Sequence, residues 1–195
     1  KGPELVGMEY EQLIPWVKPV SVDEKGKWSD ASDKAFRIIP GDYVTTEDGT
    51  GIVHIAPTFG ADDAFVAKAA GIPSLFMINK SGETRPMVDL TGKFYMMDEL
   101  DEEFVKQCVD VELYKEYDGR WVKNAYDPQF TVNKVYDEKA AAAAETLDVV
   151  ICLMMKGANK AFKIEKHTHN YPHCWRTDKP VLYYPLDSWF IRTTA

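Results

Sequence analysis

The stretch GTGIVHIAPTFGADD, residues 49–63, changes its apolar pattern at Pro57. Ahead of the proline, a glycine pair leads into β-branched residues that surround a single histidine, His54, as in an extended strand. Beyond it, two aspartates open a segment that Gly71 and Pro73 bring to an end, which predicts a helix of about ten residues. The stretch therefore predicts strand, loop and helix in succession, and with them a mixed α/β fold.

Short strands are predicted on both sides of this stretch. Residues 35–46 alternate enough to form a strand, and the Asp48-Gly49 pair is typical of a hairpin turn between them and residues 50–56. Residues 1–40 contain apolar runs that are interrupted by prolines and by a polar segment, which indicates strands joined by an exposed loop. Residues 72–84 predict a further strand with a turn at Ser81-Gly82.

Two longer helices are predicted in the second half of the chain. In residues 98–114, one helical face carries Leu100, Phe104, Cys108 and Val111. Cys108 is therefore expected in the core, where free cysteines usually lie. Residues 137–157 contain alanines and other strong helix formers, and one face of that segment carries Leu147, Ile151 and Met154 ahead of a stop at Gly157.

Charge and composition argue against several functions. The formal net charge is −8 at pH 7, so the chain as a whole repels a phosphate backbone, and any nucleic acid must be held elsewhere. No apolar run approaches the roughly 18 residues that span a bilayer, and no signal segment opens the chain, so we expect no membrane partner. Three widely spaced cysteines fit a reducing compartment, and we expect a cytoplasmic protein.

His54 and Asp63 are the first candidates for chemistry. In an extended strand His54 faces away from Val53 and Ile55, on a side that could line a cavity. Asp63 falls in the first helical turn, where the helix dipole favours a carboxylate that could receive a substrate ammonium. The local pattern leaves plainer alternatives open: a hydrogen-bonded strand histidine, and ordinary helix-start acids at Asp62 and Asp63.

A second cluster lies near the C-terminus, where eight residues include His167, His169, His173 and Cys174. These side chains could offer metal ligands, but Pro172 breaks the strand register and no second ligand pair appears elsewhere. We therefore predict no metal site. The sequence also lacks the nucleophile elbow, the catalytic cysteine motifs and the P-loop that would indicate other enzyme classes.

The stretch GTGIVHIAPTFGADD resembles the editing domain of isoleucyl-tRNA synthetase, a large domain inserted into the catalytic core of that enzyme. Three further segments are similar to the same family: LVGMEYEQLIPW, DGRWVKNA and YPHCWRTDKPVLYYPLDSWFI. The related leucyl and valyl enzymes share the Gly-Thr-Gly opening and the final aspartate. They usually lack a histidine at the place of His54 and the Phe59-Gly60 pair, which favours the isoleucyl family.

The resemblance implies a β-barrel-like core with peripheral helices, with the editing domain in residues 1–165 and a return segment toward the catalytic core in residues 166–195. It implies hydrolysis of valine that is wrongly attached to tRNA(Ile). Asp63 would bind the α-amino group, and His54 would contact the aminoacylated end and position the water or act as general base. The other substrate-binding residues that it implies are Gly49, Thr50, Gly51 and Phe59.

The same resemblance sets the expected partners: the aminoacylated 3′ end of tRNA(Ile), the misattached valine and the remainder of the parent synthetase. No cofactor is expected in this domain, because ATP and Mg would serve the parent catalytic core. The chain begins without Met and ends within a strand-like stretch, so we expect an excised domain. Two other functions stay open: a non-catalytic module that binds an amino acid or a partner, and a free-standing aminoacyl-tRNA deacylase.

The sequence departs from the family pattern at three places. The threonine-rich segment that supplies part of the editing pocket is expected before Lys1, so we expect little or no hydrolysis by residues 1–195 alone. Cys174 is not followed by the second cysteine of the C-x-x-C pair that zinc-containing members carry. The region before RWVKNA is longer than usual, and Asn124 stands where Asp is usual.

Overall fold

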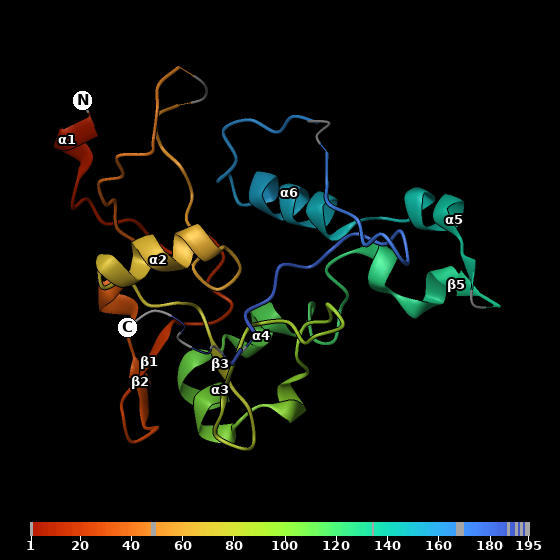
Figure 1. Ribbon diagram of the computed structural model, residues 1–195, viewed down its shortest axis with the longest axis horizontal. Helices are drawn as coiled ribbons and strands as arrows, with labels where there is room; N and C mark the ends of the chain where they lie inside the picture. Colours follow the sequence, from red (N-terminus) through yellow and green to blue (C-terminus); the bar gives the residue numbers. More distant parts are fainter. Residues whose placement is uncertain are drawn as a thin grey trace.

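Short helices and two-stranded sheets make up the computed structural model, which describes residues 2–47, 50–133, 135–166, 170–186, 188, 189, 191 and 193 (Figure 1). The α-helices are α1 (Gly2–Leu5), α2 (Ala61–Ala69), α3 (Glu102–Cys108), α4 (Val111–Tyr114), α5 (Glu138–Ala143) and α6 (Leu147–Gly157). Short 3-10 helices cover Ser32–Lys34, Met97–Glu99, Asn124–Tyr126 and Pro128–Phe130. In the described part of the chain, no helix is long and apolar enough to cross a membrane.

Within the described residues, the strands pair as three separate antiparallel hairpins. They are β1 (Val20–Val22) with β2 (Trp28–Asp30), β3 (Met77–Ile78) with β4 (Thr84–Arg85), and β5 (Thr131–Val132) with β6 (Val135–Tyr136). In the β3–β4 turn, the side-chain oxygen of Asn79 accepts hydrogen bonds from the backbone N–H of Ser81 (3.0 Å) and of Glu83 (2.9 Å). The predicted turn at Ser81-Gly82 and the strand-and-loop pattern before residue 40 are confirmed.

The mixed α/β class is confirmed, but the described residues form no closed barrel, where we expected a barrel-like core. A barrel forms when every strand pairs with both of its neighbours until the sheet closes on itself. These strands are two or three residues long, and within the described chain each pairs with one partner only. Beyond them, pairing continues as single bridges such as Val17–Val109 and Lys93–Trp121. Pro19 directly precedes β1 and Pro86 directly follows β4, and a proline has no N–H to donate to a ladder.

The strand predicted over residues 35–46 is also absent. Phe36 has a φ of +51°, a left-handed conformation that interrupts an extended chain. The segment is held by backbone hydrogen bonds to the residues after α1, including Tyr10 N–H to Phe36 O and Gly7 N–H to Ile38 O, both 2.8 Å. Alternation of side chains was therefore a poor guide here, because the backbone turns inside the alternating run.

The predicted helix over residues 98–114 is divided into α3 and α4. Val109 is extended, with φ −109° and ψ 127°, and the side chain of Asp110 then caps α4 by accepting a hydrogen bond from Leu113 N–H at 3.1 Å. The predicted apolar face is correct as far as the break, since Phe104 and Cys108 are buried, whereas Val111 is exposed. Burial raises the pKa of the Cys108 thiol, which stays protonated at neutral pH.

The helix predicted over residues 137–157 is likewise two helices, α5 and α6. Thr146 separates them because its hydroxyl caps α6, accepting a hydrogen bond from Val149 N–H at 3.4 Å. Leu147 is buried, Ile151 and Met154 pack against the same core, and α6 ends at Gly157 as predicted. The apolar face was thus identified correctly, and the interruption came from a residue that prefers to begin a helix.

Aromatic side chains dominate the centre of the core. Trp16 stacks on Tyr117 with ring centroids 3.7 Å apart and meets the edge of Phe94, which in turn meets the edge of Tyr114. The Tyr114 side chain is fully buried, and its hydroxyl donates a hydrogen bond of 2.7 Å to the backbone carbonyl of Tyr95. Tyr117 donates instead to the sulfur of Met154 in α6, at 3.4 Å.

Replacing these two phenols separately tests the core. Tyr114→Phe leaves the Tyr95 carbonyl without its donor, so we expect the free energy of unfolding to fall by about 1 to 2 kcal/mol. Tyr117→Phe removes a bond to sulfur, a weak acceptor, so its loss should stay below about 1 kcal/mol. Urea unfolding of both variants measures the difference, and an equal loss in both would contradict this account of the core.

Candidate functional site

The predicted site residues lie in the loop that leads into α2. Residues 52–56 form no strand, and no segment in the described chain pairs with them. Ile52 and Val53 are both more than half exposed, so the predicted alternation of buried and open faces is wrong for Val53. Residues 41–47 and 50–56 form the two sides, or arms, of a loop that projects from the body of the molecule (Figure 1). Asp48 and Gly49, the predicted turn, lie outside the described residues.

Asp63 closes a compact turn at the start of α2. Its carboxylate oxygen Oδ2 accepts a hydrogen bond of 2.8 Å from the backbone N–H of Ala56. The carbonyl of Ala56 in turn accepts from Phe59 N–H and Gly60 N–H, both at 3.0 Å. Asp63 is the third residue of α2, so its negative charge is also favoured by the helix dipole. Asp63, predicted as a helix-start acid, thus also holds the preceding loop in place.

The other carboxylate oxygen of Asp63, Oδ1, is the one that could bind a ligand. Within the described residues, no hydrogen bond or ion pair to Oδ1 is found, and the side chain is half-buried. A carboxylate held by one backbone amide keeps acceptor positions for a cationic group. Asp62, by contrast, is exposed and makes no such contact with the described chain, as expected for a solvated helix-start acid.

His54 is exposed on the open arm two residues before Ala56. Two residues span at most roughly 7 Å, so the bond between Ala56 and Asp63 keeps the His54 backbone within roughly 10 Å of that carboxylate. His54 makes no hydrogen bond with other described residues, which leaves both ring nitrogens available to a ligand. The structure therefore places His54 and Asp63 at one end of α2 without a direct contact between them.

The predicted glycine-threonine opening is described at Thr50 and Gly51, whereas Gly49 lies outside the described residues. Gly51 has a φ of +77°, which a glycine adopts without strain. The hydroxyl of Thr50 and the backbone of Ile52 hydrogen-bond locally, at 3.3 Å, so this hydroxyl helps to hold the bend. Thr50 itself is exposed.

Phe59 faces the core, where its ring meets the edge of Tyr184 with centroids 6.3 Å apart. Tyr184 is fixed in turn by a hydrogen bond of 3.0 Å from its hydroxyl to the carbonyl of Val88. Burial and the nearby Tyr95 raise the pKa of Tyr184 to about 12, so its hydroxyl remains a neutral donor. Phe59 thus anchors the loop to the core, and a contact with substrate stays a prediction.

Thr58 is a residue of this loop that sequence reasoning missed. It is buried, with 7% of its surface exposed, and its hydroxyl donates a hydrogen bond of 3.0 Å to the carbonyl of Leu75. Leu75 lies beyond α2, so Thr58 ties together the two ends of the loop-helix unit. A polar residue between Pro57 and Phe59 signals a turn, but its partner is not encoded in the local pattern.

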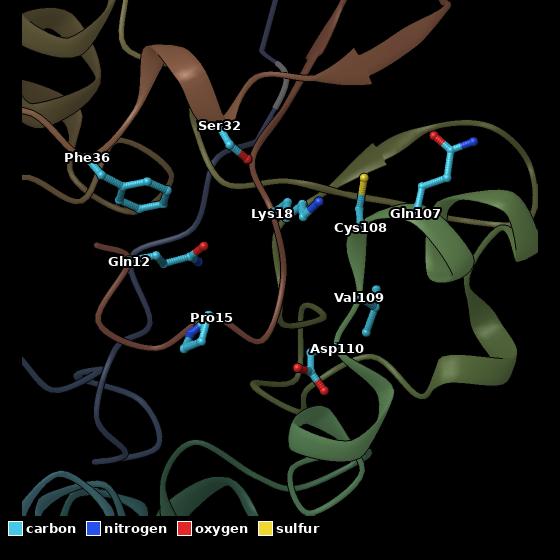
Figure 2. Close-up of a pocket in the computed structure, with 9 residues that line it drawn as sticks. All are labelled: Gln12, Pro15, Lys18, Ser32, Phe36, Gln107, Cys108, Val109 and Asp110. Atoms are coloured by element: carbon cyan, nitrogen blue, oxygen red, sulfur yellow. The ribbon is translucent and has the colours of Figure 1, made fainter. Parts of the chain in front are cut away.

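The cavity in Figure 2, of about 520 Å³, lies elsewhere, between the segment before β1 and the end of α3. It is lined by Gln12, Pro15, Lys18, Ser32, Phe36, Gln107, Cys108, Val109 and Asp110, and none of the predicted site residues is among them. Its polar side chains already have partners: Lys18 pairs with Asp30 at 3.3 Å, and Gln12 donates to the carbonyl of Val17 at 2.8 Å. Because its thiol is protonated, Cys108 offers this cavity no nucleophile.

The C-terminal histidine cluster is described in part. His167 and His169 lie outside the described residues, whereas His173 is exposed and lies 3.6 Å from the carboxylate of Asp178. In the portions of the chain that the structure describes, no group of three or more potential ligands is placed to hold a metal ion.

All 195 residues align with isoleucine–tRNA ligases. The chain is 80% identical to the enzyme of Bacteroides thetaiotaomicron, 70% to that of Bacteroides fragilis and 60% to that of Porphyromonas gingivalis. It spans 17%, 15% and 15% of the length of these relatives, respectively. No family model matches the chain.

Removal of the Thr58 hydroxyl tests the attachment of the loop. Thr58→Val keeps the size of the side chain but leaves the Leu75 carbonyl without its donor, so we expect a loss of about 1 to 2 kcal/mol in the free energy of unfolding. Thr45→Val, at an exposed threonine of the same region, is the matched control and should change stability by less than about 0.5 kcal/mol. Equal urea midpoints for the two variants would rule out the proposed anchor.

Proposed function

Because the chain is homologous over its whole length to a segment of isoleucine–tRNA ligases, we propose that it is their editing domain, which hydrolyses valine wrongly attached to tRNA(Ile). The observation that carries the proposal is the Asp63 carboxylate, held by the Ala56 amide at the end of an open loop that also carries His54. The resemblance of residues 49–63 to that domain supports the same assignment.

The need for a second site follows from the size of the substrates. One methylene in a hydrophobic pocket changes binding by roughly 1 to 3 kcal/mol, a general figure for which isoleucine–tRNA ligases are themselves a standard example. A synthetic site that accepts isoleucine therefore also accepts some valine. A second site sized for valine excludes isoleucine by steric overlap and removes the error.

In the proposed reaction, the open oxygen of Asp63 accepts a hydrogen bond from the α-ammonium of the misattached valine. This charge-assisted contact fixes the aminoacyl group and brings its ester within reach of water. Water attacks the carbonyl carbon, and the bond between that carbon and the ribose oxygen breaks. The water supplies the new oxygen of the valine carboxyl group and a proton for the ribose oxygen, so the products are free valine and a tRNA with a free terminal hydroxyl. Because water attacks the ester directly, the step needs no covalent enzyme intermediate.

His54 would act on the other side of the ester. Its exposed ring can donate a hydrogen bond to the terminal ribose or orient the attacking water. We favour this positioning role over general-base catalysis. Gly49, Thr50 and Gly51 would let the aminoacylated 3′ end approach the backbone closely, and Phe59 would border the pocket from the core side.

The remaining parts of the proposal concern the parent enzyme. A net charge of −8 suits a domain that receives the tip of the tRNA while the rest of the ligase grips its body. ATP and Mg would be used in the synthetic site and not in this domain. We expect the parent ligase to work in the cytoplasm.

Substitution of Asp63 in the full-length ligase tests the proposal. Loss of a charged anchor costs about 2 to 5 kcal/mol, so Asp63→Ala should slow the deacylation of valyl-tRNA(Ile) by roughly 30-fold or more. Asp62→Ala removes the same charge from the neighbouring exposed position and should leave the rate unchanged. If Asp63→Ala edits as fast as the wild type, Asp63 does not bind the amino group.

Two substitutions of His54 separate positioning from base catalysis. If His54 positions the water or the ribose, His54→Ala should slow deacylation by roughly tenfold, and His54→Gln, which keeps a hydrogen-bonding amide, should recover part of the rate. Loss of a general base would instead slow both variants by about 100-fold or more. Single-turnover deacylation measures all three enzymes, and isoleucylation of tRNA(Ile) serves as the control for an intact synthetic site.

A further inference from the structure

The Cα of Gly60 faces the carboxylate of Asp63 at close range. A Cβ atom built on Gly60 would lie 2.6 Å from Oδ2 of Asp63, 2.9 Å from its Cγ and 3.1 Å from its Cβ. Contacts below 3.0 Å are not tolerated between such atoms, so any other residue at this position must displace the carboxylate. The backbone of Gly60 is ordinary, with φ −111° and ψ 125°, so conformational strain does not require a glycine here.

The carboxylate that would be displaced is the one that holds the loop. Oδ2, the oxygen nearest to the missing Cβ, is the acceptor of the Ala56 N–H bond at 2.8 Å. The backbone of Gly60 takes part in the same turn, since its N–H donates to Ala56 O and its carbonyl accepts from Ala64 N–H at 2.8 Å. A backbone shift of Gly60 would strain these two bonds, whereas the Asp63 carboxylate is the end of a flexible side chain and shifts more easily.

Gly60 also occupies the N-cap position of α2, where helices favour a side chain that accepts a hydrogen bond, such as serine. Here no side chain caps the helix. A serine would therefore suit the helix and still collide with Asp63. A capping side chain and an undisturbed Asp63 carboxylate thus exclude each other at this position. The glycine found here leaves the helix without a side-chain cap and keeps the carboxylate in place.

We propose that Gly60 is a positioning residue of the editing site: its missing side chain lets the Asp63 carboxylate fold back onto the Ala56 amide, which aims the second oxygen at the substrate ammonium. This inference rests on the proposed function, because it assigns Gly60 a part in the same site. If Gly60 served only the helix, its substitution would change the stability of α2. In the proposed role, its substitution slows editing because it displaces the Asp63 carboxylate.

Gly60→Ser and Gly60→Ala in the full-length ligase test the proposal. Displacement of a binding group by about 1 Å costs up to about 100-fold, so we expect both variants to deacylate valyl-tRNA(Ile) 10- to 100-fold more slowly. Because Gly60→Ser and Asp63→Ala both lose the Ala56 bond and serine is a good N-cap, Gly60→Ser should lower the thermal unfolding midpoint of the ligase no more than Asp63→Ala does. Gly157→Ala is the control, since a Cβ at Gly157 meets no atom within 4 Å, and it should edit normally.

A double-mutant cycle then asks whether Gly60 acts through Asp63. In the Asp63→Ala background the obstructed carboxylate is gone, so Gly60→Ser should cause no further loss of editing. A second loss as large as that in the wild-type background would overturn the positioning role. A normal rate for Gly60→Ser beside a slow Asp63→Ala would overturn it as well, while leaving the proposed function intact.

A readout without substrate separates the two proposals. In the full-length ligase, hydrogen–deuterium exchange at the Ala56 amide should be slow in the wild type and faster in both Asp63→Ala and Gly60→Ser. If this exchange speeds up while Asp63→Ala edits normally, the positioning of the carboxylate stands and the editing function fails. If the Ala56 amide of Gly60→Ser exchanges as slowly as that of the wild type, the positioning role is wrong whatever the editing rates are.

Discussion

The stack of Trp16 on Tyr117 holds together a fold that has little regular sheet. Its centroid distance of 3.7 Å brings the segment before β1 against the chain that follows α4. Through Phe94 and Tyr114 the contact extends to the turn between β4 and α3, and through the Tyr117 hydroxyl it reaches Met154 in α6. Where ladders are two or three residues long, large aromatic side chains supply the buried area that sheet pairing does not.

The proposed site is attached to this core by contacts of different kinds. Phe59 contacts Tyr184 through ring packing, and the Thr58 hydroxyl hydrogen-bonds to Leu75. Within the site itself, the Asp63 carboxylate holds the loop through the amide of Ala56. These contacts involve residues 56–63, whereas His54, Ile52 and Val53 lie exposed on the arm before them. In the proposed function, an exposed arm beside an anchored loop would receive a substrate that arrives as the end of a much larger molecule.

The sequence predicted the helical faces better than it predicted extended structure, while the roles of the predicted site residues stay predictions. Helix α2 and the buried positions of Phe104, Cys108 and Leu147 followed from spacing alone, because a helical face is a local property of the chain. The strand at 50–56 failed because a strand exists only where another segment pairs with it. The strand at 35–46 failed because the backbone turns at Phe36. The contact between Asp63 and Gly60 was equally out of reach, because spacing gives no side-chain rotamer.

The single bridges that replace long ladders also bear on how the chain folds. Val17 pairs with Val109, and the hydroxyl of Tyr184 reaches the carbonyl of Val88 across 96 residues of sequence. Contacts between such distant positions require large loops to close before the core forms, which slows folding relative to a helical domain of the same size. The packing of Phe59 on Tyr184 is another contact of this kind, so the attachment of the candidate site to the core also depends on the closure of a large loop.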